Sequence, residues 1–154
     1  MPRLTTPNPS VVHPKMPNTM AQQLDAVAAT FGIIRSRVAR VIIGESLADA
    51  SLRAPILAEI ERQRSSRLTG ESTQVIATMD HQTSVAFSDL MASTGARGTE
   101  VARAILTVAC DGRLARFKKA FIAESAWRDE VLERQRAKVI ETAKRLGLEL
   151  KVDA

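Results

Sequence analysis

The chain has 154 residues, of which 45% are hydrophobic and 25% are charged, so it can bury a core but holds no more than one domain or two very small ones. Only 3% of its residues are aromatic and tyrosine is absent, which favours packed helices over β-sandwiches, whose strands draw on aromatic side chains. The net charge of +5 and the pI of about 10.0 suit an anionic partner, although the same charge also promotes solubility.

The sequence also argues against several classes of protein. Cys110 is the single cysteine, so neither a disulfide framework nor a thiolate zinc cluster can form within the chain. No apolar run approaches the roughly 20 residues that span a bilayer, and the N-terminal segment lacks the apolar stretch of a signal peptide. We therefore expect a cytoplasmic protein that does not enter membranes.

Residues 1–20 contain five of the six prolines and only two basic side chains, Arg3 and Lys15. Closely spaced prolines interrupt regular structure, so this segment is predicted to be a disordered arm. Some DNA-binding proteins use such an arm to follow a DNA groove, and a plain disordered tail is the alternative interpretation.

Three helices are predicted within residues 21–68. The first starts this segment and ends before Gly32, with apolar residues at helical spacing. Ser36 or a neighbour is expected to cap the second helix. The third covers residues 52–67, with Pro55 in its first turn, where proline is tolerated.

A second unit is predicted for residues 71–124, after a linker at Thr69 and Gly70. Acidic residues outnumber basic residues by five to two in residues 71–112, so this unit is the acidic part of the chain. Its expected elements are a short helix over 71–80, an extended stretch over 85–87, a helix that Ser88 caps and Gly95 ends, and a helix over 100–110 that Thr99 caps.

Residues 125–150 are predicted to hold a C-terminal amphipathic helix, which covers residues 125–146. Leu132, Val139 and Leu146 recur every seven residues, which is the spacing of a short dimer seam. A homodimer through this helix is one interpretation, and packing of the helix on its own chain is the other. The single tryptophan, Trp127, is expected to anchor the helix in the core.

The most informative feature is an internal repeat with a separation of 63 residues. Residues 27–42 align with residues 90–105, and six of the sixteen positions are identical, including a glycine and a Val-Ala-Arg triplet. Alanine-rich helices produce such matches readily, so the kinds of residue that are kept carry more weight than the count.

The first copy resembles a helix–turn–helix motif. Ala28 lies four positions before Gly32, where that family has a small residue and a turn glycine. The branched residues Val38 and Val41 follow at the spacing of the family. The resemblance implies a second helix in the DNA major groove, with four residues toward bases and phosphates: Arg35, Ser36, Arg37 and Arg40.

The second copy matches the motif less closely, at Gly95, Val101 and Ala104, and with its flanking segments it resembles a winged-helix domain. That resemblance implies further DNA contacts from Arg97, Thr99 and Arg103.

A winged-helix domain also has a short β-wing after its second helix. Residues 115–124 show no clear alternation of two strands, so the wing is an open alternative. In and just before this region Arg113, Arg116, Lys118 and Lys119 form a basic cluster, which suits either phosphates or a solvated surface.

Together these features predict a mainly α-helical bundle with two helix–turn–helix-like units, and a sequence-specific DNA-binding protein that regulates transcription. Its partner would be double-stranded DNA, with no cofactor and no metal. An enzyme is not expected, because His13 and His81 have no carboxylate or cysteine at catalytic or metal-binding spacing. The main alternative is a helical structural or assembly adaptor, such as a phage or mobile-element packaging or virion component.

Overall fold

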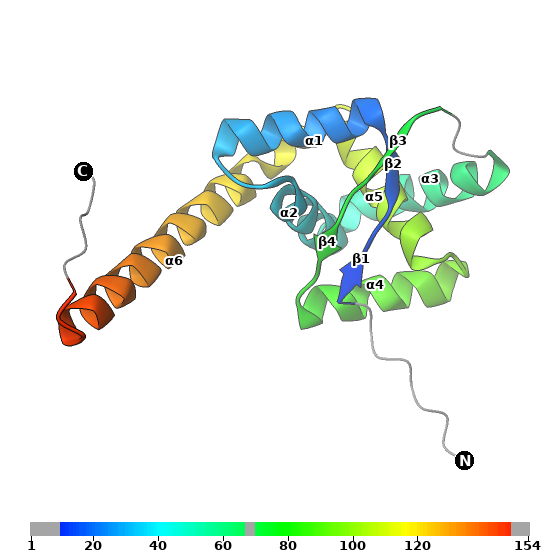
Figure 1. Cartoon of the computed structure of the whole chain (residues 1–154). Helices are drawn as coiled ribbons and strands as arrows, with labels where there is room; N and C mark the ends of the chain where they lie inside the picture. Colours follow the sequence, from blue (N-terminus) through cyan, green and yellow to red (C-terminus); the bar gives the residue numbers. More distant parts are fainter. Residues whose placement is uncertain (1–9, 67–69, 149–154) are drawn as a thin grey trace, which may run out of the picture.

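The computed structural model describes residues 10–66 and 70–148, and this part of the chain folds into six α-helices, two 3-10 helices and four short strands (Figure 1). The prediction of a mainly helical protein is confirmed. The first half contains β1 (Val11–Val12), β2 (Lys15–Pro17), α1 (Asn18–Phe31), α2 (Arg35–Ala48), η1 (Ala50–Leu52) and α3 (Arg53–Ser65). The second half contains β3 (Ser72–Gln74), β4 (Ala77–Thr78), α4 (His81–Thr94), α5 (Gly98–Cys110), η2 (Leu114–Phe117) and α6 (Lys118–Arg145).

The two halves repeat one another in structure. α4 begins and ends 63 residues after α1, and α5 begins 63 residues after α2. In each half a turn with a left-handed glycine joins the first two helices, at Gly32 (φ 67°) and Gly95 (φ 68°). The order strand, helix, turn, helix therefore occurs twice, and the repeat extends well beyond the aligned segments of the sequence.

The strands of one half pair with the strands of the other. β1 is antiparallel to β4 and β2 is antiparallel to β3, and both pairings follow one register. A backbone hydrogen bond from Val75 N to Pro14 O (2.9 Å) bridges the two pairings, so they form one continuous two-stranded ribbon. The register places His13 opposite Ile76, and these residues are also equivalent in the 63-residue repeat. A pseudo-twofold axis therefore passes through the middle of the ribbon.

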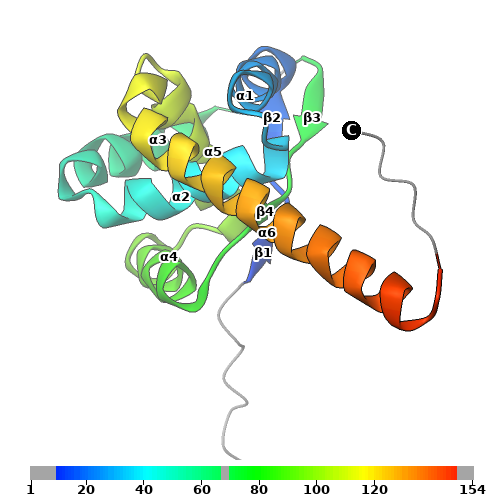
Figure 2. The same cartoon turned by 90° about the vertical axis from the view of Figure 1, so that its left-hand side faces the viewer.

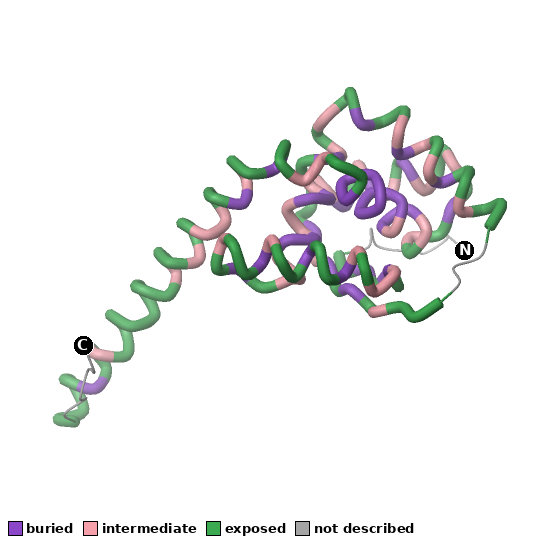
Figure 3. The backbone as a smooth tube through the Cα atoms, turned by 90° about the horizontal axis from the view of Figure 1, so that it is seen from above, coloured by how far each residue is buried: buried purple, intermediate pink, exposed green. Residues whose placement is uncertain are grey.

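The core lies between the ribbon and the helices, with α2 and α5 at its centre (Figure 3). The Val-Ala-Arg triplet of each repeat lies there, with its valine and alanine fully buried. One cluster of buried side chains runs from Val12 to Phe121, so the predicted units 21–68 and 71–124 share a single core. The buried ribbon residues are Val12, Pro14, Met16, Val75, Ala77 and Met79.

The last helix, α6, begins on this core and then leaves it. Phe121 is buried against Phe31, with ring centroids 5.3 Å apart. Arg128 donates a hydrogen bond from Nη1 to the Gly32 carbonyl oxygen (2.5 Å). Beyond Arg128 the helix projects from the body of the molecule, and most of its residues are exposed (Figures 1 and 2).

The predicted disordered arm is wrong from residue 10 onward. Residues 11–17 form the first strand of the ribbon, and α1 already begins at Asn18. Prolines are tolerated here because both strands of a two-stranded ribbon are edge strands, and because Pro17 directly precedes a helix. Residues 1–9 of the predicted arm lie outside the described residues.

The predicted helix over residues 71–80 is also wrong, because this segment contains β3 and β4. Its residues alternate between buried and exposed, from Gln74 through Met79, which is the period of a strand. The strands that pair with β3 and β4 lie in the other half of the chain, so the sequence pattern of residues 71–80 alone did not indicate their partners. The extended stretch expected over 85–87 lies inside α4.

The segment that was expected to carry a wing, residues 115–124, is helical: it contains the end of η2 and the start of α6. The C-terminal helix accordingly begins at Lys118, before the predicted start at Ser125. Trp127 is 48% exposed, so the prediction that it anchors the core is wrong.

The serine and threonine caps predicted for three helices are wrong as well. Ser36 and Thr99 lie in the first turns of α2 and α5, and Ser88 lies inside α4. Asp80 caps α4, because its carboxylate accepts a hydrogen bond from the Thr83 N–H (2.7 Å). His81 is the first residue of that helix.

Two glycines should respond in opposite ways to substitution by alanine. We expect Gly32→Ala to lower the free energy of unfolding by about 1–2 kcal/mol, because its φ of 67° lies in the left-handed region. We expect Gly44→Ala, inside α2, to raise it by up to about 1 kcal/mol, because the new Cβ would meet only Thr83 Oγ1, at 3.5 Å. Chemical denaturation measures both values, and a Gly32→Ala chain as stable as the natural chain would contradict the assigned turn.

Candidate nucleic-acid interface

The arginines expected to face DNA from the start of α2 are engaged within the chain. Arg35 Nη1 lies 3.3 Å from the carboxylate of Asp25 on α1. Arg37 Nη1 lies 3.6 Å from Glu124 on α6, and its guanidinium lies 5.0 Å from the centroid of the Trp127 ring. Both side chains are about one-third exposed, at 33% and 35%. The start of α2 therefore presents partly covered, paired arginines.

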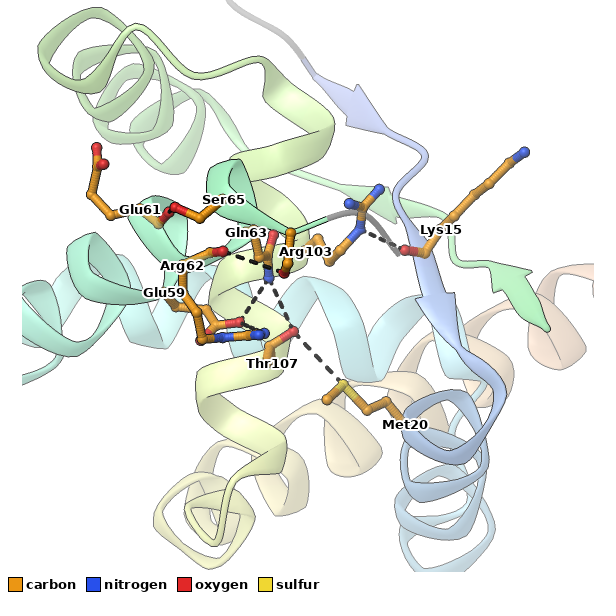
Figure 4. A network of polar contacts seen from close by, with 10 residues as sticks. Lys15, Met20, Glu59, Glu61, Arg62, Gln63, Ser65, Arg103 and Thr107 are labelled. Atoms are coloured by element: carbon orange, nitrogen blue, oxygen red, sulfur yellow. Dashed lines mark hydrogen bonds and ion pairs between the residues drawn. The ribbon is translucent and has the colours of Figure 1, made fainter. Parts of the chain in front are cut away.

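Arg40 and Arg103, which are equivalent in the repeat, contact the ribbon. Arg40 Nη1 donates a hydrogen bond to Thr78 Oγ1 (3.2 Å). Arg103 Nε donates one to the backbone oxygen of Lys15 (2.7 Å), as Figure 4 shows. Thr78 and Lys15 are themselves equivalent, so each arginine reaches from the second helix of one half to the same place on the strand of the other. The two contacts fix the ribbon on the helical core at both ends.

The first turns of α2 and α5 form a second matched pair. Their N-cap residues, Ile34 and Arg97, make no side-chain cap hydrogen bond, so the first amides of both helices lack a cap acceptor. Arg97 and Thr99 are exposed, and Ser36 is half-buried. In Figure 1 the turns that precede the two helices lie on opposite sides of the ribbon. Uncapped helix N-termini favour anions such as phosphate.

The predicted basic cluster lies at the junction of η2 and α6. Lys118 and Lys119 are exposed in the first turn of α6. Arg116 is exposed too, and its Nη1 lies 4.0 Å from the Asp49 carboxylate. Arg116, Lys118 and Lys119 therefore lie on other elements, η2 and α6, than the arginines that contact the ribbon.

The outward side of the ribbon is a surface that the sequence interpretation missed. Side chains alternate along both strands, and the outward ones are exposed, Val11 to 41% and Ile76 to 48%. Thr78 is the exception, because it is half-buried beneath Arg40. The outward residues are Val11, His13, Lys15, Gln74, Ile76 and Thr78, and we call them the ribbon face.

The ribbon face combines polar and apolar side chains. Lys15 carries an ammonium group, and Figure 4 shows its side chain directed away from α5. Gln74 offers an amide, and His13 an imidazole. Val11 and Ile76 offer branched apolar surface. Donors of this kind pair with guanine and adenine edges, and apolar groups contact the thymine methyl.

Each end of the ribbon also has one carboxylate that accepts a hydrogen bond from another residue of the chain. The backbone hydrogen bond from Thr83 holds the pKa of Asp80 below its ordinary value, with help from the Thr83 side chain and the charge of Arg40. Glu71 accepts a hydrogen bond from Asn18 Nδ2 (3.1 Å). Both carboxylates are therefore engaged beside the ribbon face and do not belong to it.

A signal for the ribbon is present in the sequence. The 63-residue offset that relates the helices also relates residues 11–17 to residues 74–80. Valine and methionine are kept there, as Val12 with Val75 and Met16 with Met79, and all four side chains are buried. Extending the repeat toward the N-terminus would have predicted two equivalent strands.

The described residues offer little for metal or thiol chemistry. Burial raises the pKa of the Cys110 thiol to about 11, so the thiol stays protonated at neutral pH. Nowhere in residues 10–66 and 70–148 do three or more His, Cys, Asp or Glu side chains gather in a group that could hold a metal ion. Over the same residues, every helix is too short or too polar to cross a membrane.

Neither a protein-family model nor a curated protein nor a solved structure matches this chain.

Proposed function

We propose that the protein binds double-stranded DNA by placing its two-stranded ribbon in the major groove. The observation that carries the proposal is the ribbon face, whose side chains are exposed while the opposite face of the same strands is buried. The major groove of B-DNA is about 12 Å wide and admits a two-stranded β-ribbon as well as a helix. Several DNA-binding proteins use strands in this way.

The proposal changes the role of the helix–turn–helix-like segments. α2 and α5 support the ribbon through Arg40 and Arg103, and we propose that their uncapped N-termini bind phosphates on either side of it. Arg97, Thr99 and Ser36 lie in these turns. Arg35 and Arg37 are occupied by Asp25 and Glu124, which favours the ribbon over α2 as the base-contacting element.

The biological role that fits best is sequence-specific regulation of transcription in the cytoplasm, without catalysis and without a cofactor. The net charge of +5 supports an anionic partner. Arg116, Lys118 and Lys119 would add attraction to phosphates that does not depend on sequence.

The test is binding of the full chain to mixed-sequence duplex DNA over a salt series, measured by fluorescence anisotropy. We expect affinity to fall with salt along a log–log line, with a slope of about −0.9 for each phosphate that a basic group neutralises. An absence of binding even at the lowest salt concentration would overturn the proposal and favour the adaptor function.

We also propose that a second copy of the chain covers the exposed apolar side of α6. Leu132, Val139 and Leu146 lie seven residues apart and are 51%, 58% and 66% exposed. Residues 124–133 hold four acidic residues and one basic residue, whereas residues 134–145 hold five basic residues and one acidic residue. Two α6 helices in antiparallel orientation would therefore join opposite charges along an apolar seam.

Analytical ultracentrifugation tests this pairing. We expect a dimer for the natural chain, a monomer for Val139→Glu, and a dimer for the control Ala137→Glu, because residue 137 lies on the other side of α6. Raising the salt concentration should weaken the dimer through screening. A monomeric natural chain, or equal loss in both variants, would overturn the pairing.

A further inference from the structure

We propose that one chain recognises a non-palindromic DNA site, because the two ends of its ribbon face carry different chemistry. This inference rests on the proposed DNA binding and adds the class of site that is bound. A protein with true twofold symmetry contacts two equivalent half-sites, so its operators are palindromic. This chain keeps the twofold arrangement of the backbone but departs from it in the side chains that face outward.

The backbone symmetry is close. Each cross-strand pair of the ribbon follows one register around His13 and Ile76, and α1–α2 and α4–α5 repeat at the same offset. Two of the three inward pairs keep their identity, as valine at 12 and 75 and methionine at 16 and 79, whereas Pro14 corresponds to Ala77. None of the three outward pairs keeps its residue identity: Val11 corresponds to Gln74, His13 to Ile76 and Lys15 to Thr78.

Antiparallel pairing sorts these outward residues by chemistry. Lys15 lies opposite Gln74 at one end of the ribbon, and Val11 lies opposite Thr78 at the other. The Lys15–Gln74 end holds an amine and an amide, which can donate to guanine and adenine edges. The Val11–Thr78 end holds methyl groups, which suit the thymine methyl.

The arginine contacts at the two ends of the ribbon also differ. Arg40 donates a hydrogen bond to the Thr78 hydroxyl, so this oxygen is already used as an acceptor within the chain. Arg103 instead binds the backbone oxygen of Lys15, so the Lys15 amine is not used by this contact. The Lys15–Gln74 end is therefore suited to hydrogen bonds, and the Val11–Thr78 end to apolar contact.

The ribbon face is long enough to separate the two kinds of contact on DNA. Residues 11 and 15 are four positions apart on one strand, which is about 13 Å at roughly 3.4 Å per residue. The same distance covers about four base-pair steps at 3.4 Å each. Substitutions at the two ends should accordingly change base preference at different positions of one site.

The experiment is selection by the full chain from a duplex library with a short randomised stretch, followed by sequencing, for three proteins: the natural chain, Lys15→Ala and Val11→Ala. We expect one non-palindromic motif for the natural chain. Lys15→Ala should lower discrimination between bases at one edge of the motif by roughly 5- to 150-fold. This range follows from one base contact of about 1–3 kcal/mol. Val11→Ala should lower discrimination at the opposite edge only.

Three results would overturn the inference. A palindromic motif, or loss of preference at the same positions in both variants, would show that the ends are not distinct, while DNA binding itself would stand. Binding without any preference would show that the ribbon face does not recognise bases. Failure to bind any duplex at low salt would overturn the proposed function together with the inference. Native mass spectrometry of Val139→Glu, the variant expected to be monomeric, should find one chain for each motif.

Discussion

Replacing both Lys15 and Gln74 with alanine is expected to weaken sequence-specific DNA binding strongly while the fold remains intact. Both side chains are exposed at the same end of the ribbon, so their loss leaves no cavity in the core. Each good base contact contributes about 1–3 kcal/mol of discrimination, so the double variant should lose at least roughly 30-fold in preference for the selected site. Competition between the selected duplex and mixed-sequence duplex measures this ratio.

Arg37→Ala is the matched control for that experiment. Arg37 lies in α2, where the helix–turn–helix resemblance places a base contact, but its guanidinium is paired with Glu124 and covers Trp127. A partly exposed ion pair is worth at most about 1 kcal/mol, so this variant should keep the preference of the natural chain. Loss of sequence preference in Arg37→Ala but not in the double variant would show that α2, and not the ribbon, contacts the bases.

The second large effect concerns stability. Phe87→Ala is expected to lower the free energy of unfolding by about 3–5 kcal/mol, because Phe87 is fully buried in α4 and its removal leaves a large cavity. The shared core predicts that the first half of the chain unfolds at the same shifted midpoint. Trp127, the only tryptophan, lies on α6 of the second half and contacts Arg37 on α2, so its fluorescence reports on the contact between the two halves, while circular dichroism reports on all helices.

Val85→Ala serves as the control on the same helix, because Val85 is 37% exposed. It should change the free energy of unfolding by about 0.5 kcal/mol at most. Separate fluorescence and dichroism midpoints in Phe87→Ala would contradict the single core, since they would mean that the contact between α6 and α2 is lost in a different step from the helices.

The sequence predicted the helical elements well because their signals are local. Gly32 and Gly95 end helices in the left-handed conformation, and the Val-Ala-Arg triplets lie at the centre of the core. The prediction of the strands failed for a physical reason. Each strand is stabilised by a partner in the other half of the chain, which local patterns do not show. Each is also too short for its alternation to outweigh the prolines or the apolar run beside it.

The candidate site was harder to predict than the fold. Arginine spacing indicated correctly that α2 and α5 carry equivalent residues, Arg40 and Arg103. It could not show that these side chains turn to the ribbon, or that Arg35 and Arg37 meet acids from α1 and α6. Such pairings depend on tertiary packing, whereas the valine and methionine kept in both strands were visible in the sequence alone.

Photo-crosslinking from the centre of the ribbon is the most direct test of the central claim, that the ribbon face contacts bases. A crosslinker attached to His13→Cys can be introduced selectively near neutral pH, because Cys110 is buried and its pKa is raised to about 11. We predict crosslinks from this position to bases of the bound duplex, and none from the control Ala137→Cys, which is exposed on the projecting part of α6. Crosslinks from residue 137 without any from residue 13 would contradict the claim.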